Sequence, residues 1–182
     1  MQKALTAIID WFGPYTLEEA KDVTKFDYDD GLYMIIGKQP DERDASLQYV
    51  GLASRLHRRL RAPKHPLHKV TKEREIWLGE VVSPRTPGKK IKVTDRMLDL
   101  AEWSHAYFLQ LPLNTQKRKT SPDRAIVTYN RWWKPDYETP YRKRPHRDWP
   151  DLIDFFADDY DAKIVWFGGR QIKAPVEEFC ED

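Results

Sequence analysis

Two apolar runs, GLYMIIGK at Gly31–Lys38 and SLQYVGLA at Ser46–Ala53, decide the fold. Both runs are typical of strands, and a polar loop, Gln39 to Ala45, joins them, which predicts a β-hairpin. Because successive side chains of a strand point to opposite faces, Tyr33 and Ile35 should share one face of the first strand. Alternate residues of the second strand should share one face of that strand: Leu47, Tyr49 and Gly51.

The residues that follow the hairpin predict three further elements. Leucines four residues apart indicate a short helix directly after the second strand, ending at Pro63. A third strand is expected at Glu75–Ser83. Thr94 or Asp95 should cap a long helix that runs to about Leu111. The central part of the chain therefore has the order β-β-α-β-α.

The segments on either side are less regular. Residues 1–30 should form two short helices, separated at Gly13-Pro14, the second of which begins with the capping box of Thr16 and Glu19. We expect three parts in the chain: an N-terminal helical segment over 1–30, a core over 31–119, and a C-terminal extension over 120–182 packed on the core.

The C-terminal extension is predicted to be β-α-β. Its first strand should cover Ala125–Trp133, its helix Trp149–Tyr160 and its second strand Lys163–Phe167. A Pro- and Arg-rich connection, residues 134–150, alternates aromatic and cationic residues. Such a segment can stack on bases and pair with phosphates, or it can simply pack across the domain surface.

Charge is distributed unevenly along the 182 residues, although the net charge is only +2. Residues 1–30 carry 3 basic and 7 acidic residues, and residues 148–182 carry 3 and 10. The middle, 31–147, carries 25 basic and 12 acidic residues and has a charge of +13. Leu52–Lys72 contains no acidic residue at all. A basic centre between acidic ends suggests a polyanionic partner, although a basic run is also typical of a solvated helix face.

Composition excludes several other classes. A charged fraction of 33 % and the absence of a long apolar run argue against a membrane protein, and the first residues do not resemble a secretion signal, so we expect a cytoplasmic protein. Cys180 is the single cysteine, which excludes an intrachain disulfide and a CxxC metal site. An aromatic content of 13 % argues against disorder.

Five elements of the sequence resemble one nuclease family. Gly31-Leu32-Tyr33 and Tyr49-Val50-Gly51 resemble the two signature tripeptides of the GIY-YIG nucleases, in the order that the family uses. The functional arginine of the family comes eight residues after the second glycine, which is the position of Arg59. The metal-binding glutamate of the family is followed twelve residues later, beyond a proline, by an asparagine, as Glu102 is by Asn114.

The resemblance spans about residues 31–116 and implies both a fold and an activity. The fold is of the α/β (α+β) type, with a three-stranded antiparallel sheet flanked by helices, in agreement with the β-β-α-β-α order. The activity is hydrolysis of DNA phosphodiesters with one divalent cation, Mg²⁺, for which Mn²⁺ can substitute. Leu52 departs from the family, which often has a lysine or another polar residue there.

The resemblance also assigns roles to the site residues. Tyr33 would position or deprotonate the attacking water, and Tyr49 would hold the phosphate or the water. Because an ordinary phenol has a pKa near ~10, the metal and Arg59 would have to lower that of Tyr33. Arg59 would clamp the phosphate, since a guanidinium stays charged and can hold two oxygens. The alternatives are that the two tyrosines only pack within their strands and that the arginine is only a solvated surface residue.

Glu102 is the expected metal ligand, because proteins commonly hold Mg²⁺ by one carboxylate and several waters. Its plain alternative is a surface glutamate. Asn114 should fix the end of the long helix to the sheet. Some members of the family use a further histidine or lysine after the arginine; Lys64, His65 and His68 are candidates here, and we favour His65 as a catalytic residue.

Other cations are expected to contact the DNA backbone and to contribute salt-dependent affinity without reading sequence. They are Arg55, Arg58, Arg61, Lys64, Lys69, Lys117, Arg118, Lys119, Arg142, Lys143 and Arg144.

The leading hypothesis is therefore a metal-dependent DNA endonuclease. Because no zinc finger, helix-hairpin-helix or long linker is evident, we favour a compact restriction or host-defence enzyme that reads sequence through residues 120–170 and acts as a homodimer. The alternatives are a catalytically silent DNA-binding module, a nonspecific, structure-specific or single-strand-preferring nuclease, and a metal-independent RNA-binding domain.

Overall fold

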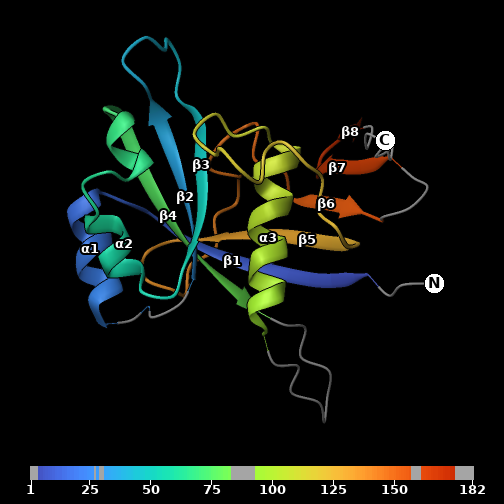
Figure 1. Cartoon of the computed structure of the whole chain (residues 1–182), viewed down its shortest axis with the longest axis horizontal. Helices are drawn as coiled ribbons and strands as arrows, with labels where there is room; N and C mark the ends of the chain where they lie inside the picture. The colour runs from blue at the N-terminus through green and yellow to red at the C-terminus, as the bar shows by residue number, and fades with distance from the viewer. Residues whose placement is uncertain (1–3, 27, 29–30, 83–92, 157–160, 175–182) are drawn as a thin grey trace.

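The computed structural model describes residues 4–26, 28, 31–82, 93–156 and 161–174. Within them, eight strands form one sheet in the order β3-β2-β4-β1-β5-β6-β7-β8 (Figure 1). The strands are β1 (Leu5–Tyr15), β2 (Gly31–Lys38), β3 (Ser46–Ala53), β4 (Lys72–Val82), β5 (Ile126–Trp133), β6 (Leu152–Phe155), β7 (Ala162–Trp166) and β8 (Arg170–Ala174). The helices are α1 (Leu17–Phe26), α2 (Leu56–Arg61), α3 (Asp95–Phe108) and the 3-10 turn η1 (Pro66–Lys69).

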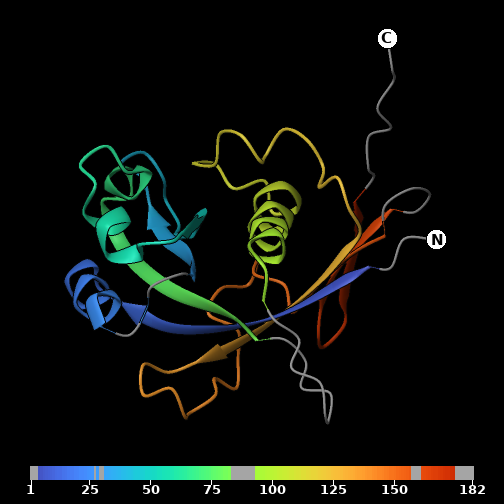
Figure 2. The ribbon, with the colours of Figure 1, turned by 60° about the horizontal axis from the view of Figure 1, so that its bottom comes forward.

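The predicted three-stranded sheet flanked by helices is wrong. β2, β3 and β4 pair antiparallel, but β1 lies beside β4 and continues the sheet through parallel pairing with β5. The resulting mixed sheet is strongly curled: α3 lies in its trough, whereas α1 and α2 pack against its outer side (Figure 2). The sheet therefore has two cores, one around α3 and one beneath α1 and α2.

β1 replaces the first of the two helices predicted for residues 1–30. Ile9 and Trp11 are fully buried on the side of α3, and Phe12 and Tyr15 are buried on the side of α1. A strand that is covered on both faces has almost continuous apolar residues, so its spacing also fits a helix. The second predicted helix is confirmed as α1, directly after Thr16.

The predicted β-α-β extension is also wrong. Where a helix was expected at Trp149–Tyr160, β6 pairs antiparallel with β5 and β7, and Ile153 and Phe155 are buried against the α3 core. The strands predicted at 125–133 and 163–167 are confirmed as β5 and β7. Four of the residues in the helix prediction, 157–160, lie outside the described residues, as do Ser83 and Cys180.

The hairpin of β2 and β3 is confirmed, with one irregularity. Tyr49 pairs with Ile35 and Leu47 with Ile36, so the additional residue Gln48 forms a bulge. The bulge turns Leu47 toward the α3 core while Tyr49 remains on the α1 side, which corrects the prediction that the two share a face. Gln48 is fully buried and donates to the carbonyl of Gly37 over 3.0 Å.

The long helix begins where it was predicted. The hydroxyl of Thr94 accepts from the amide of Met97 and caps α3. α3 covers 14 residues and ends at Phe108, three residues before the expected end at Leu111. None of the helices in the described ranges is long and apolar enough to cross a membrane.

Candidate functional site

Tyr33 lies across Gly51, its partner on the edge strand β3. A Cβ atom at Gly51 would be 2.3 Å from Cζ of Tyr33 and 2.4 Å from its hydroxyl oxygen. Only a glycine therefore lets the ring cross the strand, and the phenol hydroxyl lies directly over the outermost strand of the sheet. β3 passes between α2 and α3 (Figure 1), so this hydroxyl lies where the two helices flank the sheet edge.

His65 holds the Tyr33 hydroxyl from the other side. His65 is buried, and its Nε2 atom lies 2.7 Å from the Tyr33 oxygen. Its Nδ1 atom accepts the amide of Leu67 over 2.9 Å at the start of η1. Because a backbone amide can only donate, Nδ1 carries no proton in the neutral ring, and Nε2–H donates to Tyr33.

Burial lowers the pKa of His65 to about 4, and the positive charge of Arg59 acts in the same direction. The imidazole is therefore neutral near pH 7. Its Nε2 proton remains in place as a donor, and the ring acts as a fixed hydrogen-bonding group rather than as a charged one.

Arg59 is the third member of the cluster. It projects from α2, is exposed, and donates from Nε to the Tyr33 hydroxyl over 3.3 Å. That hydrogen bond raises the pKa of Arg59 above its already high usual value, so the side chain is cationic at every accessible pH. A guanidinium has five N–H donors, and donors remain for a phosphate.

Tyr49 completes a group of three rings. Its centroid lies 5.8 Å from that of Tyr33 and 5.4 Å from that of His65. Tyr49 is 8 % exposed, whereas Tyr33 is fully buried. Of the two tyrosines, Tyr49 is therefore the one with surface open to a ligand.

Tyr33 is not suited to act as a base. Burial raises its pKa above 10, the neighbouring Tyr49 adds to the effect, and Arg59 opposes it only in part. The phenol is protonated near pH 7, and its oxygen already accepts from both Arg59 and His65. The hydroxyl can orient Arg59, but deprotonation of water by Tyr33, one of its two predicted roles, is not what this environment favours.

Glu102 reaches the same edge strand from the other side. It projects from α3, and Oε1 accepts the amide of Leu52 over 3.1 Å. Leu52 directly follows Gly51, so Glu102 and the Tyr33 hydroxyl lie beside consecutive residues of β3. The Glu102 side chain is 14 % exposed, and burial raises its pKa while Lys117 opposes the rise.

Lys117 forms an ion pair with Glu102. Its ammonium group contacts Oε2 of Glu102 and lies 2.6 Å from Oδ1 of Asp99, one helical turn earlier on α3. Burial lowers the pKa of Lys117, but these two hydrogen bonds outweigh it and hold the pKa above its usual value. Lys117 was predicted to contact DNA, and here it neutralises two carboxylates of its own chain.

Asn114 fixes the outer edge of β3. Its side-chain oxygen accepts the amide of Val50 over 3.0 Å, and its amide donates to the Val50 carbonyl over 2.8 Å. The Leu113 amide donates to Gln48 further along the strand. A strand edge that would otherwise be unpaired is thus satisfied by the segment after α3, which is the structural role expected of Asn114.

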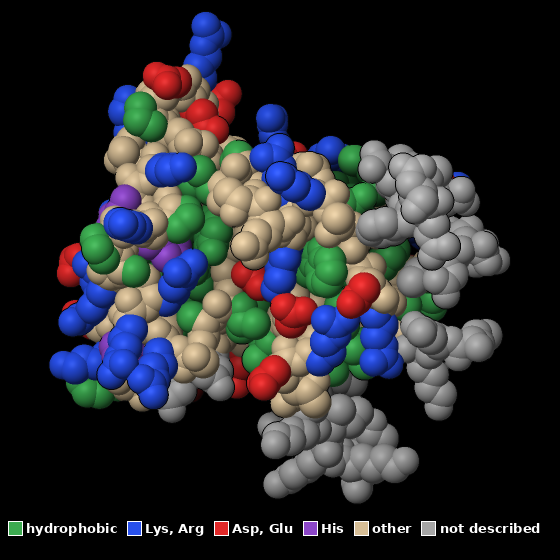
Figure 3. Space-filling view, viewed as in Figure 1, with side chains coloured by type: hydrophobic (Ala, Val, Ile, Leu, Met, Phe, Trp, Pro, Cys, Tyr) green, Lys and Arg blue, Asp and Glu red, His purple; other side chains and the backbone are tan. Residues whose placement is uncertain are grey.

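The predicted DNA-binding cations fall into three groups. Exposed side chains on α2 and on the residues directly before and after it form a basic surface, visible at the left of Figure 3: Arg55, Arg58, Arg61, Lys64 and Lys69. Beyond α3, Lys119 is exposed and Arg118 is half-buried against Gln110. In the connection after β5, Arg142 and Lys143 are exposed, but Arg144 donates to Asp151 over 2.5 Å and to the Phe167 carbonyl over 3.0 Å.

The donor set at Glu102 suits Mg²⁺ chemically, because that ion prefers carboxylate oxygens. Oε2 of Glu102 contacts the Lys117 ammonium, which would have to withdraw for a metal to bind. No group of three or more His, Cys, Asp or Glu side chains comes together in the described part of the chain. A metal there would therefore take most of its ligands from water and substrate.

Sequence reasoning missed Asp99 and the Lys117 contact. The signal for Asp99 was present, since it lies three residues before Glu102 on the same face of the helix. Nothing in the sequence indicated that Lys117 would fold back onto that face. The comparisons with known proteins add no assignment: no protein-family model, curated protein or solved structure matches the chain.

Proposed function

We propose that the protein hydrolyses phosphodiester bonds in DNA at the cluster of Tyr33, Arg59, His65 and Glu102 around β3. One observation carries the proposal: a buried phenol, itself held by a neutral imidazole, anchors a cationic guanidinium on one side of β3, and a half-buried carboxylate contacts the same strand from the other side. Phosphoryl transfer requires positioning and stabilisation of charge on the phosphate oxygens, and a fixed guanidinium supplies both.

Arg59 would bind the scissile phosphate. The Tyr33 oxygen holds its Nε atom, and His65 holds the oxygen, so the guanidinium is oriented before substrate arrives. Tyr33 and His65 are positioning residues in this scheme. Tyr49, partly open at the same cluster, would donate to a phosphate oxygen or to the attacking water.

Glu102 would hold the divalent cation, with Mg²⁺ as the preferred ion and Mn²⁺ as a substitute. A bound Mg²⁺ would supply Lewis-acid stabilisation of the phosphate and the leaving oxygen. The Leu52 amide fixes one carboxylate oxygen and leaves the other for the cation. Lys117 would neutralise Glu102 in the absence of metal.

A second candidate is a DNA-binding module without activity. The contact that favours it is the ion pair of Lys117 and Glu102, which already neutralises the carboxylate that would have to hold the metal. This module would use the basic surface of α2 and would bind DNA without metal.

The test incubates the purified chain with supercoiled, linear and single-stranded DNA, with Mg²⁺, Mn²⁺ or EDTA. The nuclease is supported if the wild type cuts DNA only with a metal, if Glu102→Gln does not cut, and if Arg58→Ala still cuts at saturating protein. Discrete bands indicate a sequence-specific enzyme of the restriction or host-defence type, for which a homodimer is expected, and a smear indicates a nonspecific nuclease. DNA binding without cleavage under every condition favours the silent module.

A further inference from the structure

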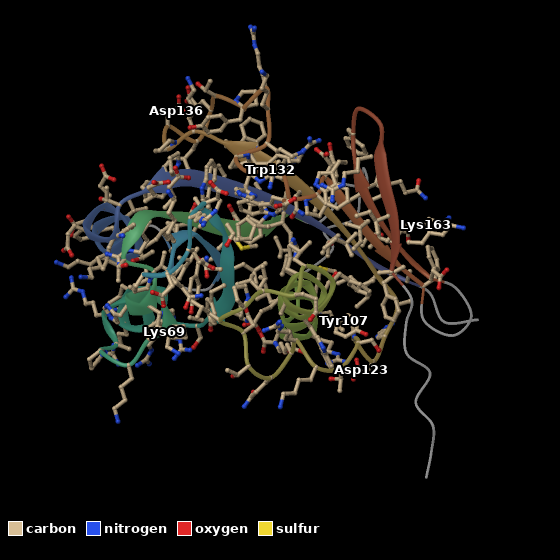
Figure 4. The ribbon with its side chains drawn as sticks, turned by 90° about the horizontal axis from the view of Figure 1, so that it is seen from above. Lys69, Tyr107, Asp123, Trp132, Asp136 and Lys163 are labelled. Carbon is tan, nitrogen blue, oxygen red and sulfur yellow. The ribbon has the colours of Figure 1, made fainter. Side chains whose placement is uncertain are left out.

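A second basic and aromatic surface lies away from the candidate site. Backbone hydrogen bonds join β5 to the start of β6 as far as Asn130, whose amide donates to the Asp151 carbonyl. Beyond Arg131, the Tyr141 amide donates to the Trp132 carbonyl. Between these points, β5 and residues 140–147 enclose a groove of about 780 Å³. In Figure 4, Trp132 and Asp136 lie at the opposite side of the molecule from Lys69, so this groove is separate from the α2 surface.

The cations of the groove are available to a ligand. Arg142, Lys143 and Arg147 line it and are exposed. Its one lining carboxylate, Asp151, is already bound by Arg144 and by the Phe167 amide. Arg147 also lies 3.7 Å from the Asp148 carboxylate, so Arg142 and Lys143 contribute most of the uncompensated positive charge of the groove.

Aromatic rings line the same groove. Phe167 is 55 % exposed, and its ring lies 5.9 Å from that of Tyr129. Further along β5, Arg131 lies over the ring of Trp133 at 5.8 Å. Arg131 is half-buried and paired with Asp10, so the exposed ring beside the exposed cations is that of Phe167. An exposed ring beside exposed cations is the combination that binds single strands, whose bases stack on the ring while their phosphates pair with the cations.

We propose that this groove binds single-stranded nucleic acid, with a base on the Phe167 and Tyr129 rings and phosphates at Arg142, Lys143 and Arg147. Duplex DNA fits less well, because its bases are stacked inside the helix and cannot reach the rings. The groove goes beyond the proposed cleavage site and does not depend on it.

The test measures binding of a fluorescent poly-dT of roughly twelve nucleotides by anisotropy, without divalent metal. We expect Phe167→Ala, and the double variant Arg142→Ala with Lys143→Ala, each to weaken binding about tenfold. The control, Lys163→Ala with Lys173→Ala, removes the same charge from exposed positions of β7 and β8 outside the groove and should bind like the wild type. Glu102→Gln should also bind like the wild type, which separates this proposal from cleavage.

Two results would overturn the proposal. One is a loss of affinity in the Lys163→Ala, Lys173→Ala control equal to that in the groove variants. The other is unchanged binding in both groove variants, with circular dichroism melts that match the wild type and so show that the variants are folded. A duplex of the same length that binds as tightly, with no effect of Phe167→Ala, would also overturn it, because base stacking would then be absent. A second readout is quenching of tryptophan fluorescence by poly-dT, which should decrease in Trp133→Phe.

Discussion

The Nε2 atom of His65 lies 2.7 Å from the hydroxyl oxygen of Tyr33, and the same imidazole accepts the Leu67 amide through Nδ1. The two nitrogens therefore have different functions: Nδ1 starts the η1 turn, and Nε2–H holds the phenol that orients Arg59. This difference can be tested with two amides, since Asn places its nitrogen and oxygen near the Nδ1 position and Gln places them near the Nε2 position.

We expect His65→Gln to retain more DNA cleavage than His65→Asn. The Gln amide can donate to Tyr33 but does not cap η1, whereas the Asn oxygen can cap η1 but does not reach Tyr33. The difference in cleavage rate should be about tenfold or more, with both variants somewhat less stable than the wild type. Cleavage rates at saturating protein, with urea unfolding as the stability readout, decide this; a faster Asn variant would contradict the role of Nε2–H.

Gly51→Ala should disrupt the cluster. The new Cβ would overlap the Tyr33 ring, and the surrounding core leaves little room for the ring to move, so we expect destabilisation of about 1–3 kcal/mol. The control is the same substitution in a Tyr33→Ala background, where the ring is absent and the additional loss should be small. Equal losses in the two backgrounds, measured by urea unfolding, would show that Tyr33 does not lie across Gly51.

Stability should fall as the pH drops from about 6.5 toward 4. Burial lowers the pKa of His65 to about 4, and burial also lowers the pKa of His105, so the unfolded chain binds protons first. Below pH 6.5 the unfolded chain binds more protons than the folded chain. The stabilisation is therefore complete above pH 6.5 and is lost as the pH falls toward 4. Urea unfolding at several pH values measures the slope, which should be shallower in His65→Gln; an identical slope would contradict the assignment to His65.

Lys117→Met should bind Mn²⁺ more tightly than the wild type. Removal of the ammonium leaves Glu102 and Asp99 without their cation, so a divalent ion no longer has to displace it. We expect a tightening of about tenfold by calorimetric titration. Lys119→Met, which removes an exposed lysine close by in sequence, is the control. Weaker or equal binding in Lys117→Met would show that Lys117 does not compete with the metal.

Local signals in the sequence predicted β2, β3, β4, β5 and β7 and the start of α3, whereas β1 and β6 were predicted as helices. Alternation in β2 and β3 and the capping residue Thr94 are local signals, and they were sufficient for the hairpin and for the start of α3. The eight-stranded sheet depends on β1 lying between β4 and β5, a long-range pairing that local spacing does not encode. β1 was mistaken for a helix because both of its faces are buried.

The candidate site likewise combines features that local sequence predicted with features that depend on tertiary structure. Spacing from the two tripeptides selected Arg59, and the structure brings it together with Tyr33, Tyr49 and His65. The pKa of Tyr33 could not be predicted, because its direction depends on burial by segments distant in the chain. The Lys117 contact depends on how the segment after α3 folds back, which is likewise a tertiary property.

The most direct measurement of the proposed function is the rate of a single turnover on supercoiled DNA with Mg²⁺, comparing the wild type with Arg59→Lys at saturating protein. Lysine keeps the charge but lacks the Nε donor that Tyr33 holds and the second donor for the phosphate. We expect the wild type to nick the DNA, and the variant to be slower by at least about 100-fold while binding DNA within about threefold of the wild type. Equal rates, or no cleavage by the wild type with any DNA or metal tested, would contradict a nuclease site at Arg59.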